Sequence, residues 1–264
     1  MLVEAGFYKL FGENPETMWF FLRHWINVVM RMLGPNAGYG VERMPRSGGL
    51  VVAANHFSSI DPPAVGIYSL RQLYYMTKVE LLNVPIAGES LRMTGSFGVR
   101  RGSGDRDAIR VARWVLQQGL AVGMFMEGTR QKFGYPGDVQ AGAAMLAMQE
   151  GVPVVPCGVD TFGWSLSNRR PYAVVFGDPI DLGGLPRNGA GYKEGAKVLE
   201  AEIVRLWRQA SEAVAAGLPK QLPDGTPRHK PIRARESYPI PNVRRWPTEP
   251  WAKVPLGPIY RSSQ

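Results

Sequence analysis

The amino-acid sequence predicts an α/β fold in which a mixed central β-sheet is flanked by helices, with an amphipathic helix ahead of it. Beyond Pro35, short apolar runs rich in β-branched residues alternate with segments of helical periodicity. The chain has 264 residues, 45% of them hydrophobic and 20% charged, which is enough apolar material for a sizeable core in one or two domains. Alternation of the two element types is typical of a sheet covered by helices.

Six strands and five helices are predicted from this alternation. The strands are expected at residues 49–55, 73–76, 96–100, 121–126, 152–159 and 173–176. The helices are expected at 62–70, 84–93, 106–118, 141–150 and 192–216. The last helix carries an apolar stripe at helical spacing that includes Leu199, Ile203 and Val214, and this predicts a core face.

An amphipathic helix is predicted at residues 17–33. Its polar residues are Arg23, His24, Asn27 and Arg31. They fall in one sector at 100° per residue, and they interrupt the ~20 consecutive apolar residues that a spanning helix needs. We therefore expect the helix to lie in a membrane interface, with Trp25 among lipid tails and Arg23 and Arg31 at headgroup phosphates. The alternative is a helix that packs its apolar face on the protein's own body.

The predicted division of the chain has three parts. A membrane-interfacial helix occupies residues 1–35, the α/β domain 36–218, and a basic, proline-rich tail 219–264. The net charge is +9, and the tail holds nine Lys and Arg against three Asp and Glu, which is +6 of the total. The tail is expected either on an anionic membrane or wrapped on the body. The first residues lack the features of a signal peptide, so secretion is not indicated.

Cysteine and histidine content limits the chemistry. Cys157 is the single cysteine and lies in an apolar run, which predicts a small buried side chain in a reducing compartment. The three histidines are scattered, so neither a metal nor a cofactor is expected. Zinc-finger, basic-zipper and RNA-binding motifs are absent, and nucleic acid is not an expected partner. A nucleic-acid binder stays an alternative, which a steep fall of affinity with salt would reveal.

The first of three polar clusters follows the predicted strand at 49–55. It reads Asn-His-Phe-Ser-Ser-Ile-Asp at positions 55–61 and comes before a helix that Pro62 can open. His56 and Asp61 can meet across a tight turn, so that the carboxylate accepts a hydrogen bond from one ring nitrogen and the other nitrogen serves as a base. A lone histidine beside an aspartate is more often structural, but open α/β sheets bind ligands at the carboxyl ends of strands, and this position strengthens the case for catalysis.

The second and third clusters combine arginine with glycine at strand ends. The second, at positions 95–102, contains Arg100 and Arg101, and the third, at 125–130, ends in Arg130. A guanidinium and neighbouring backbone N–H groups can converge on a phosphate. Together the two clusters predict one phosphorylated ligand.

Other catalytic templates are missing from the sequence. No Gly-x-Ser-x-Gly elbow is present, so Ser58 and Ser59 are poor candidates for a hydrolase nucleophile. Neither a Walker loop nor a Gly-x-Gly-x-x-Gly fingerprint occurs, which leaves nucleotide-driven phosphoryl transfer and hydride transfer unsupported. Base catalysis by His56 on a substrate hydroxyl is the chemistry that remains.

These clusters resemble, in order, the sequence blocks of the glycerolipid acyltransferase family, of the bacterial 1-acylglycerol-3-phosphate O-acyltransferase type. Positions 55–61 look like the Asn-His-x4-Asp block, 95–100 like the block that ends in a phosphate-binding arginine, 125–130 like the Phe-Pro-Glu-Gly-Thr-Arg block, and 152–156 like the fourth, apolar block. Lys-Val-Glu-Leu at 78–81 resembles a further family stretch. The sequence departs from the pattern at Met126, where proline is usual, and at Gln131, where serine is common.

The resemblance implies transfer of a fatty acyl group from a thioester to the sn-2 hydroxyl of 1-acyl-glycerol-3-phosphate, which gives phosphatidic acid. It implies that His56 is the general base and that Asp61 orients its ring. It also places the phosphate of the acceptor on Arg100 and Arg130. The remaining candidates are Glu127, Gly128 and Thr129, which would shape the pocket, and Asn55, Lys78 and Arg101.

The implied partners are a lysophospholipid acceptor, acyl-CoA or an acylated carrier protein as donor, and an anionic membrane surface. The expected location is the cytoplasmic side of the cell membrane, where the protein is attached peripherally as a monotopic protein. Two alternatives stay open beside the nucleic-acid one. They are the same chemistry on another lysophospholipid or a lyso-aminolipid, and a membrane-lipid-binding module without catalysis.

Overall fold

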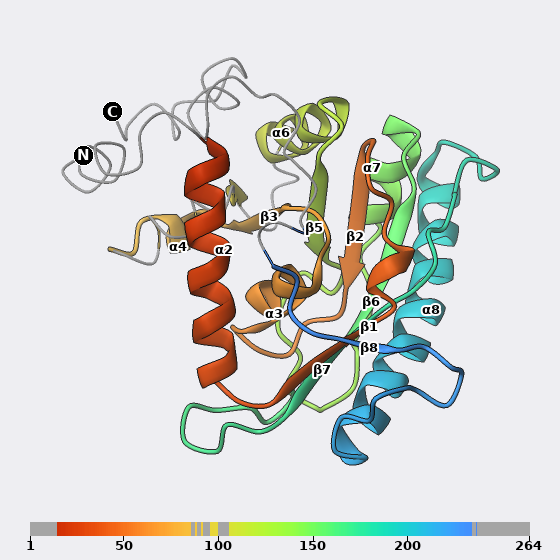
Figure 1. Cartoon of the computed structure of the whole chain (residues 1–264). Helices are drawn as coiled ribbons and strands as arrows, with labels where there is room; N and C mark the ends of the chain where they lie inside the picture. The colour runs from red at the N-terminus through yellow and green to blue at the C-terminus, as the bar shows by residue number, and fades with distance from the viewer. Residues whose placement is uncertain are drawn as a thin grey trace.

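An eight-stranded mixed β-sheet forms the centre of the computed structural model (Figure 1). The structure describes residues 15–85, 88, 91, 96–99, 106–233 and 236. In sheet order the strands are β4 (Phe97–Val99), β3 (Leu73–Lys78), β5 (Ala121–Phe125), β2 (Leu50–Ala54), β6 (Val154–Asp160), β7 (Tyr172–Phe176), β1 (Asn36–Tyr39) and β8 (Arg228–His229). The described helices are α2 (Pro15–Met32), α3 (Asp61–Tyr68), α4 (Val79–Leu82), α6 (Arg106–Gln117), α7 (Gly142–Glu150) and α8 (Gly189–Ala215), with a 3-10 turn at Val41–Arg43. The predicted α/β class is confirmed.

The direction of the strands decides where their ends meet. Strands β4, β3, β5, β2 and β6 run parallel, β7 is antiparallel to β6, β1 is parallel to β7, and β8 is antiparallel to β1. The carboxyl ends of β5, β2 and β6 therefore lie next to one another on one edge of the sheet. This edge receives the segments that follow those three strands.

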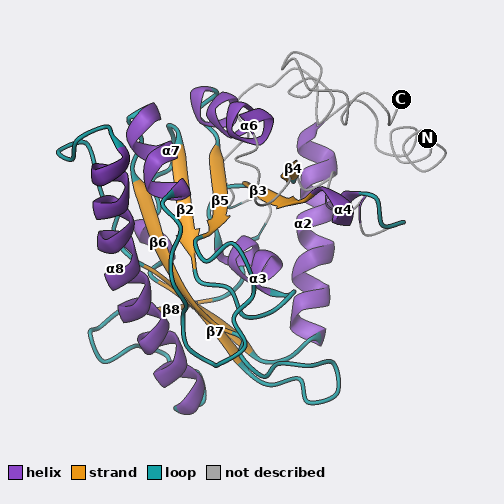
Figure 2. Cartoon of the chain, turned by 180° about the vertical axis from the view of Figure 1, so that it is seen from behind, coloured by secondary structure: helices purple, strands orange, loops and turns teal. Residues whose placement is uncertain are grey.

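Helices cover both faces of the sheet: α6, α7 and α8 lie on one face, and α2 and α3 on the other (Figures 1 and 2). Strand β2 is buried along its whole length, as expected for a central parallel strand. Its side chains alternate between the two layers. Val51 and Ala53 pack in the cluster with α6, α7 and α8, whereas Leu50, Val52 and Ala54 pack in the cluster with α2 and α3.

The predicted elements agree closely with the observed ones. All six expected strands are present, and the helices expected at 62–70, 106–118, 141–150 and 192–216 correspond to α3, α6, α7 and α8. The apolar stripe of the last helix is buried, with Leu199 and Ile203 in the core, as predicted. Cys157 is buried in β6, as expected, and this burial raises the pKa of its thiol well above the ordinary value.

Two strands and one helix differ from the expectation. Strands β1 and β8 are not predicted because they have only four and two residues, and Asn-Ala-Gly-Tyr in β1 contains no β-branched side chain. Their pairing depends on tertiary contacts. The helix expected at 84–93 lies largely outside the described residues, and ahead of it the structure has the short helix α4.

Helix α2 turns one edge of its polar sector toward the body, which corrects the predicted orientation of Arg23, whereas His24 and Arg31 are exposed. Arg23 is 2% exposed, and Asn27 and Met30 are buried with it. The outer side carries Trp25, 66% exposed, and Met32, 68% exposed. Arg23 and Asn27 bind main-chain carbonyls of the protein itself. Of the polar sector, His24 and Arg31 are therefore the residues that can meet lipid headgroups. Among the described helices, none is long and apolar enough to cross a membrane.

Arg23 joins three segments that are distant in sequence. Its Nη2 donates to the carbonyl oxygens of Ser69 at 2.6 Å and Ile67 at 3.2 Å, and its Nε donates to that of Ile232 at 3.1 Å. Asn27 Nδ2 donates to the same Ile232 carbonyl at 2.9 Å. Burial lowers the pKa of Arg23 to about 10, so the guanidinium stays charged at neutral pH.

The part of the expected tail that the structure describes belongs largely to the folded body. Strand β8 pairs with β1, and the backbone N–H of Ile232 donates to Ile67 O at 2.8 Å. Leu222 and Ile232 are buried. Residues 219–233 thus close the free edge of the sheet and then run between α2 and α3, because β1 leaves an edge to pair and α2 offers buried donors.

Replacing Arg23 with leucine is expected to lower the free energy of unfolding by about 2–4 kcal/mol, because three buried carbonyls lose their charged donor. Urea unfolding followed by circular dichroism measures the change. The matched control is Arg31→Leu on the exposed side of the same helix, which should stay within about 0.5 kcal/mol of wild type. Equal losses in the two variants would contradict the role given to Arg23.

Candidate active site

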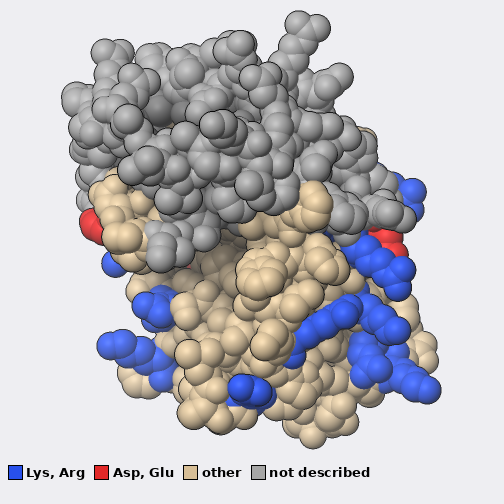
Figure 3. Space-filling view, turned by 60° about the vertical axis from the view of Figure 1, so that its left-hand side comes forward, with Lys and Arg blue, Asp and Glu red and all other residues tan. Residues whose placement is uncertain are grey.

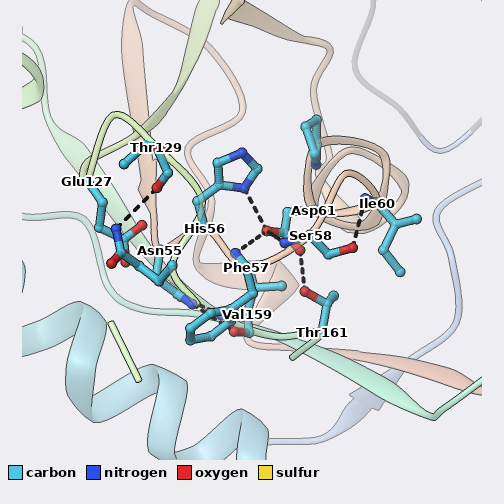
Figure 4. A network of polar contacts seen from close by, with 12 residues as sticks. Asn55, His56, Phe57, Ser58, Ile60, Asp61, Glu127, Thr129, Val159 and Thr161 are labelled. Carbon is cyan, nitrogen blue, oxygen red and sulfur yellow. Dashed lines mark hydrogen bonds and ion pairs between the residues drawn. The ribbon is translucent and has the colours of Figure 1, made fainter. Parts of the chain in front are cut away.

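His56 and Asp61 lie together at the carboxyl end of β2 (Figure 4). The Nδ1 of His56 is 2.7 Å from Oδ2 of Asp61. Because a carboxylate accepts hydrogen bonds, Nδ1 is the donor in this contact, and in the neutral imidazole the free lone pair is then on Nε2. Figure 4 shows that the far nitrogen of the ring points away from the carboxylate, so it is available to another group. The turn thus brings the two side chains together as the spacing in the sequence predicts.

Asp61 is fully buried, and hydrogen bonds from two strand ends hold its carboxylate. Oδ2 accepts from the backbone N–H groups of Phe57 at 2.6 Å and Ser58 at 2.8 Å, in addition to His56. Oδ1 accepts from the hydroxyl of Thr161, which follows β6. These donors satisfy a charge that would otherwise be very costly to bury.

Aromatic stacking fixes the plane of the His56 ring. The ring of Phe125, the last residue of β5, lies 4.2 Å from that of His56 at an interplanar angle of 23°. The ring of Tyr75 also stacks on that of Phe125, with the centroids 5.9 Å apart, and the Tyr75 hydroxyl donates to Pro62 O at 2.9 Å. A side chain at Gly123 would strike the Tyr75 ring, since its Cβ would lie 2.4 Å from Cε1. Glycine at 123 therefore makes room for the stack.

Asn55 joins the ends of β2 and β6. Its Nδ2 donates to Val159 O at 2.8 Å, and its Oδ1 accepts from Val159 N at 2.8 Å. The side chain is buried and extends the ladder between these two strands beyond the last backbone pair, Ala54 with Cys157. This arrangement fixes the point at which the chain leaves β2, immediately before His56.

Glu127 is a buried carboxyl in the turn after β5. Burial raises the pKa of Glu127 to about 8, although a hydrogen bond from the backbone N–H of Gly137, at 3.2 Å from Oε1, acts in the opposite direction. The group is therefore mainly protonated at pH 7. It can donate a hydrogen bond and adds no negative charge beside Asp61.

The residues after Glu127 turn back beside His56. Gly128 has φ +67°, a left-handed conformation that side chains disfavour, and its N–H donates to Phe125 O at 3.1 Å. Gln131 N then donates to His56 O at 2.8 Å. Thr129 and Arg130 are exposed in this turn. Because Gln131 is bonded to His56, the backbone of Arg130 lies close to His56.

Two further candidates, Arg100 and Arg101, lie outside the described residues. The strand before them is described, and the register of β3 and β4 pairs Lys78 with Val99. Lys78 is exposed at the end of β3. Lys78 therefore lies beside Val99, the residue that precedes Arg100 in the sequence.

The sequence pattern does not single out several residues of this arrangement. Thr161 and Phe125 contact Asp61 and His56, and Tyr75 supports the stack. Phe125 is the first residue of the third cluster, and its position at a strand end is a feature from which a place near the site can be predicted. Thr161 is about 100 residues from Asp61, and no spacing rule predicts contact over that distance.

The sequence of the chain is similar to those of known acyltransferases. A model of the acyltransferase family matches residues 38–160. The 1-acyl-sn-glycerol-3-phosphate acyltransferase of Bacillus subtilis is 27% identical over 62% of this chain and 82% of its own length. The protein of the same name from Streptococcus pneumoniae is 27% identical over 74% of this chain and 75% of its own length.

A solved structure has a similar fold. The crystal structure of the 1-acyl-sn-glycerophosphate (LPA) acyltransferase, PlsC, from Thermotoga maritima covers 73% of this chain and 80% of its own, with a TM-score of 0.58 and 20% identity. The chain belongs to the acyltransferase family and is an acyltransferase. The matched segment contains His56, Asp61 and the turn at 127–130.

Proposed function

We propose that this acyltransferase moves a fatty acyl group from a thioester to the sn-2 hydroxyl of 1-acyl-glycerol-3-phosphate and so forms phosphatidic acid. The single observation that carries the chemistry is the His56–Asp61 pair, in which Asp61 engages Nδ1 and leaves Nε2 to face a substrate. The names of the Bacillus subtilis and Streptococcus pneumoniae relatives support the choice of acceptor. Acyl-CoA or an acylated carrier protein would supply the thioester.

His56 acts as general base in the proposed reaction. Its Nε2 takes the proton of the acceptor hydroxyl while the oxygen attacks the thioester carbonyl. Asp61, hydrogen-bonded to Nδ1, stabilises the imidazolium that forms, and the stack with Phe125 keeps the ring in place. The carbon–sulfur bond then breaks, and the departing thiolate needs little help from an acid because thiols have low pKa values. The bound proton leaves His56 with the thiol product or to water.

Arg130 is proposed to bind the phosphate of the acceptor together with Arg100. Arginine matches the geometry of phosphate oxygens, and Arg130 belongs to the turn that Gln131 ties to His56. Glu127 suits this pocket because its raised pKa removes a charge that would repel the phosphate. Gly128 and Thr129 shape the turn. Lys78 and Arg101 are additional cations for the same ligand, and Asn55 acts by positioning His56.

The protein is proposed to attach peripherally to the cytoplasmic side of the membrane. Helix α2 presents Trp25, Val28 and Met32 to the outside, and apolar side chains of this kind enter the boundary of a bilayer. The exposed Arg31 lies in the last turn of the helix, where it can meet anionic headgroups. The acyl chain of the acceptor then reaches the site without crossing water.

His56→Ala is expected to reduce thioester consumption with lysophosphatidic acid about 100- to 10,000-fold, because the hydroxyl loses its base. Thiol release from acyl-CoA in the presence of anionic vesicles measures the rate. His229→Ala, which removes a partly buried histidine paired with Glu42, is the control and should keep the wild-type rate. Equal rates for His56→Ala and wild type would refute the assigned base.

Arg130→Ala is expected to raise the KM for lysophosphatidic acid by about 10-fold or more, because a charge-assisted contact with phosphate is lost. The KM for an acceptor that lacks a phosphate monoester should change much less. Arg187→Ala, an exposed arginine outside the strand ends of the site, serves as control. An equal change for both acceptors would place the phosphate elsewhere.

A further inference from the structure

We propose that two loops beside the site form a second contact with an anionic lipid bilayer, separate from the outer side of α2; this inference rests on the proposed function. The loops are residues 129–140, which follow β5, and 161–171, which follow β6. We call their exposed side chains the loop patch. It consists of Phe133, Tyr135, Phe162 and Leu166 together with the basic residues Arg130, Lys132 and Arg169.

The apolar part of the loop patch is unusually exposed. Phe133 is 75% exposed and Leu166 is 71% exposed, and Tyr135 and Phe162 are also exposed. The rings of Phe133 and Tyr135 stack at 6.2 Å, so these two side chains form one surface. Large apolar side chains that cluster on the outside of a protein commonly mark an interaction site.

Contacts join the loop patch to α2 and to the proposed site. A Cβ at Gly134 would lie only 2.9 Å from the ring of Phe162, so the two loops touch. Phe162 in turn lies edge-on to Phe57 at 5.8 Å, next to His56. Trp164 Nε1 donates to Leu33 O at 2.9 Å, which fastens the second loop to the end of α2. Figures 1 and 2 both show this loop beside the lower end of the helix.

The charges of the loops favour an anionic partner. Arg130, Lys132 and Arg169 are exposed, whereas Asp160 is buried and pairs with Arg170 at 3.3 Å. Asp138 is an exposed acid in the first loop. Figure 3 shows the face that carries α2: Lys and Arg border a broad uncharged area, and Asp and Glu appear only near its margin. Basic groups around apolar side chains suit a membrane with anionic lipids.

A bilayer fits this surface better than an acidic carrier protein. The most exposed apolar side chains belong to two separate loops, and fluid lipid adapts to such protrusions without a complementary surface. The loop patch also continues toward the apolar side of α2 through Trp164 and Leu33, so one bilayer can meet both.

The test places a fluorophore on the second loop. Cys157 is fully buried, so Leu166→Cys provides a single accessible thiol for an NBD label on the full chain. Vesicles of phosphatidylcholine with phosphatidylglycerol should shift the NBD emission to the blue and raise it about twofold or more, since the dye leaves water. Phosphatidylcholine alone should give a weaker response. Val198→Cys on α8, labelled in the same way, should not respond.

Two outcomes would overturn the proposal. If the protein sediments with the vesicles but NBD at position 166 stays as in water, the loop patch does not contact the bilayer. If an acidic acyl carrier protein changes the emission and vesicles do not, the partner is a protein. Phe133→Ser combined with Leu166→Ser should weaken vesicle binding at least about tenfold. Wild-type transfer to lysophosphatidic acid dispersed in detergent tests the proposed function separately.

An independent observation assigns Thr161 as a positioning residue for the same reaction. Its hydroxyl donates to Oδ1 of Asp61, whereas His56, Phe57 and Ser58 all contact Oδ2. Thr161 is buried and follows β6, one residue beyond the segment that matches the family model. Without this hydroxyl the carboxylate could rotate and draw Oδ2 away from Nδ1.

Thr161→Val keeps the shape of the side chain and removes the donor. It should lower kcat about 10- to 100-fold while the KM for the acceptor stays within about twofold, because the base is displaced and the phosphate contacts are not. Thr161→Ser should restore most of kcat. Thr226→Val, which removes a buried hydroxyl that accepts from Arg43, is the matched control and should leave kcat unchanged. An unchanged kcat in Thr161→Val, or a loss that serine does not restore, would overturn the assignment.

Discussion

A carboxylate buried away from water has to be stabilised by hydrogen-bond donors, and in this protein that carboxylate is Asp61. The N–H groups of the turn after β2, the His56 ring and a hydroxyl after β6 supply those donors. Loss of one donor from a buried acceptor costs about 1–3 kcal/mol. The requirement therefore ties the turn at 56–61 to the neighbouring strand, and the orientation of the imidazole follows from it.

The order of the strands makes this arrangement possible. Strand β2 lies between β5 and β6 and runs parallel to both, so three chain segments leave the sheet at one edge. The segment after β2 brings the His–Asp pair, the one after β5 brings Phe125 and Glu127, and the one after β6 brings Thr161. Helices on both faces keep water from the strands themselves, and the polar chemistry is concentrated where the strands end.

Local pattern predicted most of this architecture, and contacts distant in sequence account for the remainder. The strand that precedes His56 and the turn that returns Asp61 could be inferred because all their determinants lie within about a dozen residues. Arg23 shows the opposite case. Periodicity placed it correctly on the polar side of α2, but the carbonyls that receive it belong to Ile67, Ser69 and Ile232. Nothing in the helix itself shows which side meets the body.

The carbonyl of Ile232 is shared by two side chains of α2, and this links two segments near opposite ends of the described residues. Arg23 and Asn27 both depend on an acceptor that lies more than 200 residues away. A protein shortened before Ile232 would keep every residue of the site but would loosen the helix proposed to hold it at the membrane. Shortened or fused versions of the chain should therefore retain residues up to at least 233 if they are to report on catalysis alone.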